Sequence, residues 1–233
     1  MNYTGKMEIE RKLKALDRIY AVYDEFIRDQ RTACQMYCHR CCTTHVTLTT
    51  LEAYKICDTL PPGEREKLFR HVCEASGLQR FRPVITINAL AELCAADQEP
   101  PPEDAAFANE KCPLLVQDLC SIYALRPLNC RCFVSRTPCE EKGYAEIDEA
   151  VLAVNTIFLQ TIEHVDADGC SANLLDMLAA IESEKNRAAY AAGRLHCTAN
   201  GLVANRPMKV LMAPPEQRGT IEPIMRKLRE IRV

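Results

Sequence analysis

Cysteine is the residue type whose number and spacing could do chemistry in this chain. The sequence has 233 residues, of which 14 are cysteine. Four thiols fall within the nine residues CQMYCHRCC at 34–42, and a second group lies within residues 112–139. Thiolates are soft, charged ligands that suit zinc and iron–sulfur clusters. The spacing therefore predicts a metal ion or an iron–sulfur cluster held by cysteines from these two segments.

The two groups together offer more thiols than one metal ion needs. The first contains Cys34, Cys38, Cys41 and Cys42, and the second contains Cys112, Cys120, Cys130, Cys132 and Cys139. One zinc ion takes four ligands, and the adjacent Cys41 and Cys42 are hard to place on a single ion. The arrangement favours two metals, a polynuclear cluster, or some thiols left free for redox chemistry. The spacing does not decide between zinc and iron.

The first group also follows helical spacing, since its cysteines occupy positions i, i+4, i+7 and i+8. If a preceding helix continues through residues 34–42, all four sulfurs fall on one stripe. Cysteine can also serve as a small core residue, but Leu or Ala would pack such a stripe better. Cysteines that occur singly are different, and we expect these to be packing residues: Cys57, Cys73, Cys94, Cys170 and Cys197.

Other polar side chains flank the thiols. His39 and His45 could act as ligands or proton carriers because histidine titrates near neutrality, although their polar stretch favours solvated side chains. Arg126 and Arg131 bracket Cys130 and could offset thiolate charge.

Helical patterns surround the cysteine segments. Apolar residues recur at helical spacing over residues 7–33, and Thr49 with Glu52 forms a capping box that predicts a helix to about Leu60. Further helices are predicted over residues 64–75, 86–97, 147–162 and 222–231. Another is predicted to begin at Ser171 as its N-cap, to continue to Ala192 and to end at Gly193. An extended segment is predicted at 203–212.

The stretch from Glu99 to Pro138 has a different texture, because its prolines rule out long helices. An irregular stretch of this length needs an organising element, which a bound metal would supply. The predicted fold is mainly α, with helices around an irregular Pro-rich, cysteine-rich metal-binding segment. We expect a single domain, residues 1–233, with the metal-binding region at about 34–139 and a helical C-terminal part at about 145–233.

Composition narrows the function classes. The formal net charge is −3 and tryptophan is absent, so the chain lacks the basic surplus and stacking platforms of a nucleic-acid binder. No apolar stretch approaches the about 18 residues that a membrane span needs. The charged N-terminus does not resemble a signal peptide. A cytoplasmic protein with reduced thiols is therefore predicted, and structural disulfides are the minority alternative.

The cysteine segments resemble those of the YkgJ-type cysteine-cluster family, whose name-giving pattern is CxxCxxCC with a CxxxCxxCC variant. The variant reads CQMYCHRCC here, and the second block resembles the family's CPxL…CxIY…RPxxCR signature, from Cys112 through Cys120 to Arg131. The family is regarded as zinc- or iron-chelating, with eight recurrent cysteines of which the last follows RPxxC by several residues. The resemblance thus implies Cys139 rather than Cys132, and the ligand set Cys34, Cys38, Cys41, Cys42, Cys112, Cys120, Cys130 and Cys139.

Several functions are compatible with such a site. The flagellin lysine N-methylase group has a similar cysteine pattern, so a protein-modifying (methylase-like) or redox enzyme is one alternative, with His39, His45 or Asp118 as candidate acid–base groups. A structural module, in which metal stabilises an interaction surface, is another. The Cys34-x3-Cys38-x2-Cys41 spacing is also that of radical S-adenosylmethionine enzymes. That function is disfavoured, because a predicted helix rather than a strand precedes these cysteines and the sequence contains no Gly-Gly pair. The predicted partner is a metal ion, with neither nucleic acid nor membrane.

Overall fold

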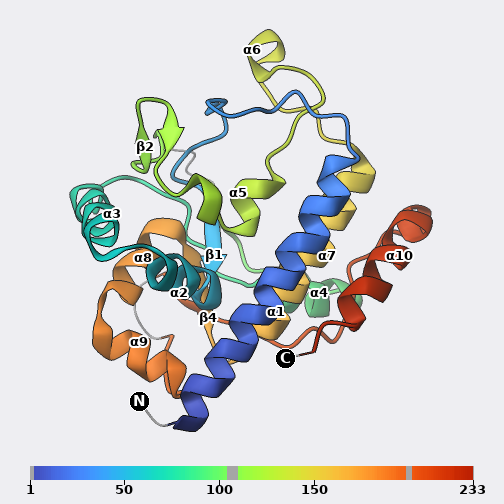
Figure 1. Cartoon of the computed structure of the whole chain (residues 1–233). Helices are drawn as coiled ribbons and strands as arrows, with labels where there is room; N and C mark the ends of the chain where they lie inside the picture. The colour runs from blue at the N-terminus through green and yellow to red at the C-terminus, as the bar shows by residue number, and fades with distance from the viewer. Residues whose placement is uncertain (1–2, 104–109, 198–200, 233) are drawn as a thin grey trace.

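The computed structural model describes residues 3–103, 110–197 and 201–232, and helices dominate this part of the chain (Figure 1). The helices are α1 (Tyr3–Arg28), α2 (Thr50–Thr59), α3 (Pro62–Glu74), α4 (Ile87–Ala95), α5 (Leu128–Cys132), α6 (Cys139–Lys142), α7 (Glu149–Val165), α8 (Leu174–Glu182), α9 (Glu184–Ala191) and α10 (Arg218–Arg229). Short 3-10 turns lie at Tyr123–Leu125 and Pro215–Gln217. The mainly α prediction is confirmed.

Five short strands join the helices in this part of the chain: β1 (Thr47–Thr49), β2 (Leu115–Val116), β3 (Leu119–Cys120), β4 (Cys170–Asn173) and β5 (Val203–Ala204). One sheet has the antiparallel order β1-β4-β5, with Leu48 opposite Ala172. The other is the hairpin β2-β3. Among the described residues β1 pairs with β4 alone, and its other edge contacts α5, the short helix that carries Cys130.

The apolar residues form two cores. In the first, α1 packs against α7 and α10, and the rings of Tyr23 and Phe158 meet edge to face with centroids 5.1 Å apart. In the second, α2, α3 and α8 pack together around buried residues such as Ile56 and Leu178. Figure 1 shows the loop that follows α1, the β2-β3 hairpin and α6 in the upper part of the view, with α2, α8 and α9 below them.

Several sequence-predicted elements are confirmed with close bounds. The Thr49 side chain accepts a hydrogen bond from the Glu52 N–H at 3.3 Å, and Glu52 accepts one from the Thr49 N–H at 2.9 Å, which completes the capping box of α2. The helices predicted over 64–75, 86–97, 147–162 and 222–231 correspond to α3, α4, α7 and α10. Gly193, at φ 63°, lies just after α9 as the predicted stop.

Other predictions were wrong in detail. The first helix ends at Arg28, so the cysteines of 34–42 lie in a loop and do not share a helical stripe. Ser171 lies within β4, where antiparallel pairing takes it, and the N-cap of α8 is Asn173. The run to Ala192 is two helices, with Ser183 capping the second.

The proline-rich stretch is less irregular than predicted, although its residues 104–109 lie outside the described part of the chain. It contains the β2-β3 hairpin, and α5 begins directly after Pro127, where a proline costs no helical hydrogen bond. In the predicted extended piece at 203–212, only Val203–Ala204 is a strand.

The single cysteines do not all serve as packing residues. Cys57 is buried as predicted, but Cys73 and Cys94 are exposed. Cys170 and Cys197 form a disulfide that ties β4 to the segment after α9. Both residues pack in the second core, as predicted, but the disulfide was not predicted, because the fold brings together cysteines that lie 27 positions apart.

Helix length and apolarity also bear on membrane insertion. Across the described residues, no helix combines the length and the apolar character needed to cross a membrane.

Candidate metal centre

Backbone hydrogen bonds hold the first cysteine segment against the second. The Ala33 N–H donates to the Ser135 carbonyl at 2.7 Å, and the Cys112 N–H donates to the Cys42 carbonyl at 2.9 Å. An isolated β-bridge joins Thr43 to the chain just before Cys112. The fold thus brings the two segments side by side, although 69 intervening residues separate Cys42 from Cys112.

The β2-β3 hairpin positions the next thiols. Gln117 and Asp118 form its two-residue turn, with φ values of 51° and 61°. Both residues therefore lie in the left-handed region that two-residue hairpins of this twist require, which glycine and asparagine adopt at lower cost. The hairpin pairs Leu115 with Cys120 and so returns the chain towards Cys112.

The short helix α5 carries Cys130, and side chains from elsewhere fix both its start and its orientation. The Glu52 carboxylate accepts a hydrogen bond from the Leu128 N–H at 2.8 Å, which satisfies a backbone donor at the start of the helix. The Asn129 amide donates to the Thr47 carbonyl at 3.0 Å and to the Thr47 hydroxyl at 2.8 Å. These bonds tie α5 to α2 and to the free edge of β1.

Seven of the eight predicted ligands line one cavity of about 190 Å³: Cys34, Cys38, Cys41, Cys42, Cys112, Cys120 and Cys130. We call this the thiol cavity. Cys139, at the start of α6, does not line it but lies near enough to Cys34 to influence that thiol electrostatically. Cys132, the last residue of α5, is buried in the first core and does not line the thiol cavity.

The thiols divide into two neighbourhoods within the cavity. Cys112, Cys120 and Cys130 interact with one another, and burial raises the pKa of Cys112 to about 11. Burial also raises the pKa of Cys130 well above its ordinary range, with smaller contributions from Cys112 and Cys120. In the other neighbourhood, a hydrogen bond with Cys42 raises the pKa of Cys41. These thiols are therefore protonated near neutral pH and must lose protons to bind a metal.

The two arginines that bracket Cys130 have different roles. The Arg126 guanidinium lies 3.8 Å from the centre of the Tyr123 ring and partly offsets the burial that raises the pKa of Cys120 and Cys130. Arg131 instead pairs with Asp24 of α1 at 3.0 Å. Arg126 is thus the arginine that moderates thiolate charge here, while Arg131 fastens α5 to α1.

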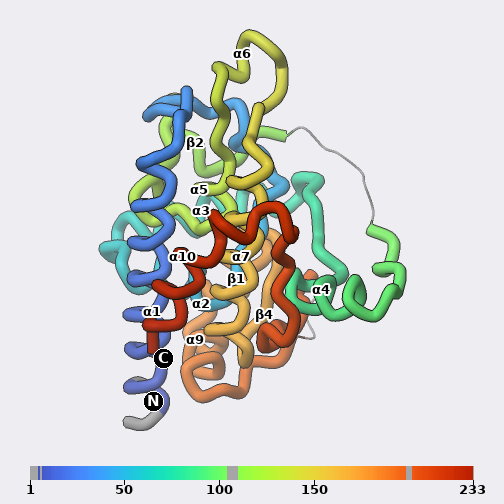
Figure 2. Tube along the Cα trace, turned by 90° about the vertical axis from the view of Figure 1, so that its right-hand side faces the viewer, coloured from blue at the N-terminus to red at the C-terminus, as the bar shows by residue number. Residues whose placement is uncertain are grey.

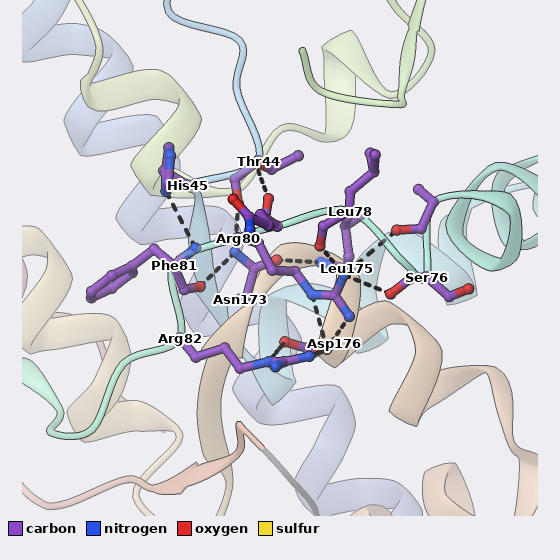
Figure 3. A network of polar contacts seen from close by, with 12 residues as sticks. Thr44, His45, Ser76, Leu78, Arg80, Phe81, Arg82, Asn173, Leu175 and Asp176 are labelled. Atoms are coloured by element: carbon purple, nitrogen blue, oxygen red, sulfur yellow. Dashed lines mark hydrogen bonds and ion pairs between the residues drawn. The ribbon is translucent and has the colours of Figure 1, made fainter. Parts of the chain in front are cut away.

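The two candidate histidines, His39 and His45, lie in different surroundings. His39 Nε2 lies 3.5 Å from a carboxylate oxygen of Asp118, so an ion pair links the first cysteine loop to the hairpin turn when the histidine is protonated. His45 accepts a hydrogen bond through Nδ1 from the Phe81 N–H at 3.2 Å (Figure 3). His45 therefore belongs to the network that anchors the chain after the first cysteine group, and it does not line the thiol cavity.

That network is built around Asn173 and Asp176. The Asn173 amide donates to the carbonyls of Thr44 and Phe81 at 2.7 and 2.9 Å. Asp176 pairs with the guanidinium of Arg80 at 2.8 Å, and Arg80 is mostly buried (Figure 3). These contacts fix the position of the chain at Thr44 and His45, directly after the first cysteine group.

A metal needs its donors to converge, and the thiols surround the cavity without doing so. Within the described residues, no three or more His, Cys, Asp or Glu side chains are grouped as a metal ion would require.

Searches of family models, curated proteins and solved structures found no match for this chain. The resemblance to the cysteine-cluster family therefore stays a prediction based on the motif residues.

Sequence reasoning missed two residues that position the site. Glu52 was predicted as a capping residue, but nothing in its spacing indicated the bond to the start of α5. Asn129 lies inside the RPxxCR pattern between Pro127 and Cys130, so the motif contained the signal without indicating its partner, Thr47.

Proposed function

We propose that this protein binds zinc, iron or an iron–sulfur cluster through thiolates of Cys34, Cys38, Cys41, Cys42, Cys112, Cys120, Cys130 and Cys139. The observation that carries the proposal is the gathering of seven of these cysteines, from two distant segments, around one cavity of about 190 Å³. The reactivity of a cysteine usually matters more than its packing, so this concentration around a cavity favours a chemical role.

The donor set fits such a group in type. Thiolates bind zinc and iron strongly, and the group when bound would supply a structural cross-link or a redox or Lewis-acid centre. Binding would release thiol protons, because burial raises the pKa of Cys112 and Cys130 and a metal is bound by the thiolate form. Arg126 would offset part of the resulting negative charge.

The same features support a cytoplasmic location in this proposal. All twelve described cysteines outside the Cys170–Cys197 disulfide are free thiols. Free thiols in this number are typical of reducing surroundings, whereas the Cys170–Cys197 disulfide is typical of an oxidising compartment.

A second candidate function is a metal-stabilised interaction module. Large apolar side chains are exposed beside the thiols: Met36 is 54 % exposed, Tyr37 61 % and Phe133 42 %. A contiguous patch of exposed apolar side chains is typical of a surface that meets a partner. A closed four-ligand metal site would favour this role, and an open coordination position or a redox-active cluster would favour chemistry.

The test is metal and acid-labile sulfide content, with a visible spectrum, on protein purified without oxygen. Cys38→Ser and Cys120→Ser should each lower the metal content, because their thiols line the cavity. Cys73→Ser is the matched control, since Cys73 is exposed on α3 away from it. Equal metal content in all three variants, or folded wild-type protein with neither zinc nor iron, would overturn the proposal.

A further inference from the structure

A second cavity, of about 620 Å³, lies between the body of the molecule and the segment that carries α4. Figure 2 shows α4 and the chain on either side of it projecting from the side of the body. The body side of the cavity is formed by β1 and by Leu159 and Ile162 of α7, and the projecting side includes Ile85 and Leu90. This volume lies within the roughly 300–1,000 Å³ typical of small-molecule sites.

The charged groups on its wall are all of one sign. Three glutamates and no lysine or arginine line the cavity within the described part of the chain: Glu52, Glu103 and Glu163. Glu52 is 4 % exposed and Glu163 is 2 % exposed, while Glu103 lies at the exposed rim. Two buried carboxylates therefore face a largely apolar space.

The groups that donate hydrogen bonds to these two carboxylates are uncharged. Glu163 accepts hydrogen bonds from the backbone N–H groups of Asn88 and Arg206, both at 2.8 Å. The Arg206 side chain is paired with Glu92 at 3.2 Å, and its charge only slightly offsets the burial that raises the pKa of Glu163. Glu52 accepts bonds from the Tyr20 hydroxyl and from backbone N–H groups. Hydrogen bonds of this kind satisfy the oxygens without neutralising the charge, which a cation could do.

We propose that this cavity binds a small organic cation, an amine carried on an apolar body. The aliphatic and proline side chains of the wall would contact the body, and the amine would lie beside the buried carboxylates. An opposite charge interacts more strongly there than in water, because the effective dielectric constant is lower. The cavity would therefore distinguish a cationic ligand from a neutral one of the same shape.

The cavity also shares α5 with the thiol cavity. Asn129 lines the larger cavity, whereas its neighbours Cys130 and Arg131 line the thiol cavity. A ligand beside Glu52 would thus lie against the helix that carries Cys130, although its binding does not depend on a metal being present.

The experiment compares two fluorescent probes on the full-length protein. Dansylcadaverine carries a primary amine on an apolar body, and N-pentyl dansylamide is its neutral counterpart. We expect the cationic probe to bind at least about tenfold more tightly to the wild type, a difference worth 1.4 kcal/mol. Glu163→Gln should remove most of this preference, and Ile85→Trp should weaken both probes by filling the space.

Glu74→Gln is the matched control, because Glu74 is an exposed glutamate on α3 outside the cavity, and it should leave both affinities unchanged. If Glu163→Gln fails to fold, Glu103→Gln at the rim replaces it and should reduce the preference in the same direction. Equal affinity of the two probes for the wild type would overturn the proposal. So would a cation preference that survives the glutamine substitution, or probe binding that Ile85→Trp leaves unaltered.

Discussion

Replacing Glu52 by alanine should destabilise the protein more than the loss of an ordinary helix cap. Its carboxylate accepts hydrogen bonds from the Tyr20 hydroxyl and the Leu128 N–H, each at 2.8 Å, and from the Thr49 N–H at 2.9 Å. A lost cap costs about 1 kcal/mol, and a buried donor left without an acceptor costs about 1–3 kcal/mol. We therefore expect Glu52→Ala to lower the free energy of unfolding by about 3–5 kcal/mol, a large part of the stability of a typical domain.

The assay is urea unfolding followed by far-UV circular dichroism, on metal-free protein with the thiols protected. Thr49→Ala is the matched control, because it removes the hydroxyl half of the same capping box and leaves the Glu52 bond to α5 in place. That variant should lose only about 1 kcal/mol. Metal content measured in parallel should fall more in Glu52→Ala than in Thr49→Ala, since α5 carries Cys130.

Comparable destabilisation by the two substitutions would contradict this reasoning. It would mean that Glu52 acts only within the capping box and that α5 is held in place by other contacts, such as the Asn129 bonds to Thr47.

Two further predictions concern a buried carboxyl group and the hairpin turn. Burial raises the pKa of Asp166 from 3.8 to about 7, so between these values the folded protein holds a proton that the unfolded chain releases. In the wild type the free energy of unfolding should therefore fall as pH rises through this window, and in Asp166→Asn it should change less. Urea titrations at several pH values measure this, and an equal dependence on pH in both proteins would contradict the prediction. Gln117, at φ 51°, should tolerate glycine with a gain of up to about 1 kcal/mol, seen as a higher melting temperature, and a lower one would argue that the Gln117 side chain matters more than its backbone.

Local signals predicted most of the helices well. The capping box of Thr49 and Glu52 depends on residues three positions apart, so the sequence is enough to place the start of α2. The concentration of cysteines in two segments was enough to predict that they lie near each other, since few other arrangements would use them. Both the helix starts and the two cysteine segments can be recognised from residues that are close together in the sequence.

The features that the sequence did not predict depend on contacts between residues far apart in the chain. The first helix stops at Arg28, and the chain beyond it bonds through the Ala33 N–H to Ser135, about a hundred residues away. Ser171 becomes part of a strand because β4 pairs with β1, a contact that no local pattern predicts. The disulfide of Cys170 is of the same kind, because a cysteine's partner cannot be deduced from its own surroundings.

The distance along the chain between the two cysteine segments has a consequence for biosynthesis. During translation, the thiols of residues 34–42 emerge long before Cys112, and α5 packs on α7, which ends only at Val165. Asn155 of α7 also donates a hydrogen bond to the Cys132 carbonyl at the end of α5. In the finished fold the position of α5 therefore depends on α7, so the wall of the thiol cavity that carries Cys130 is complete only after residues up to Val165 have been made.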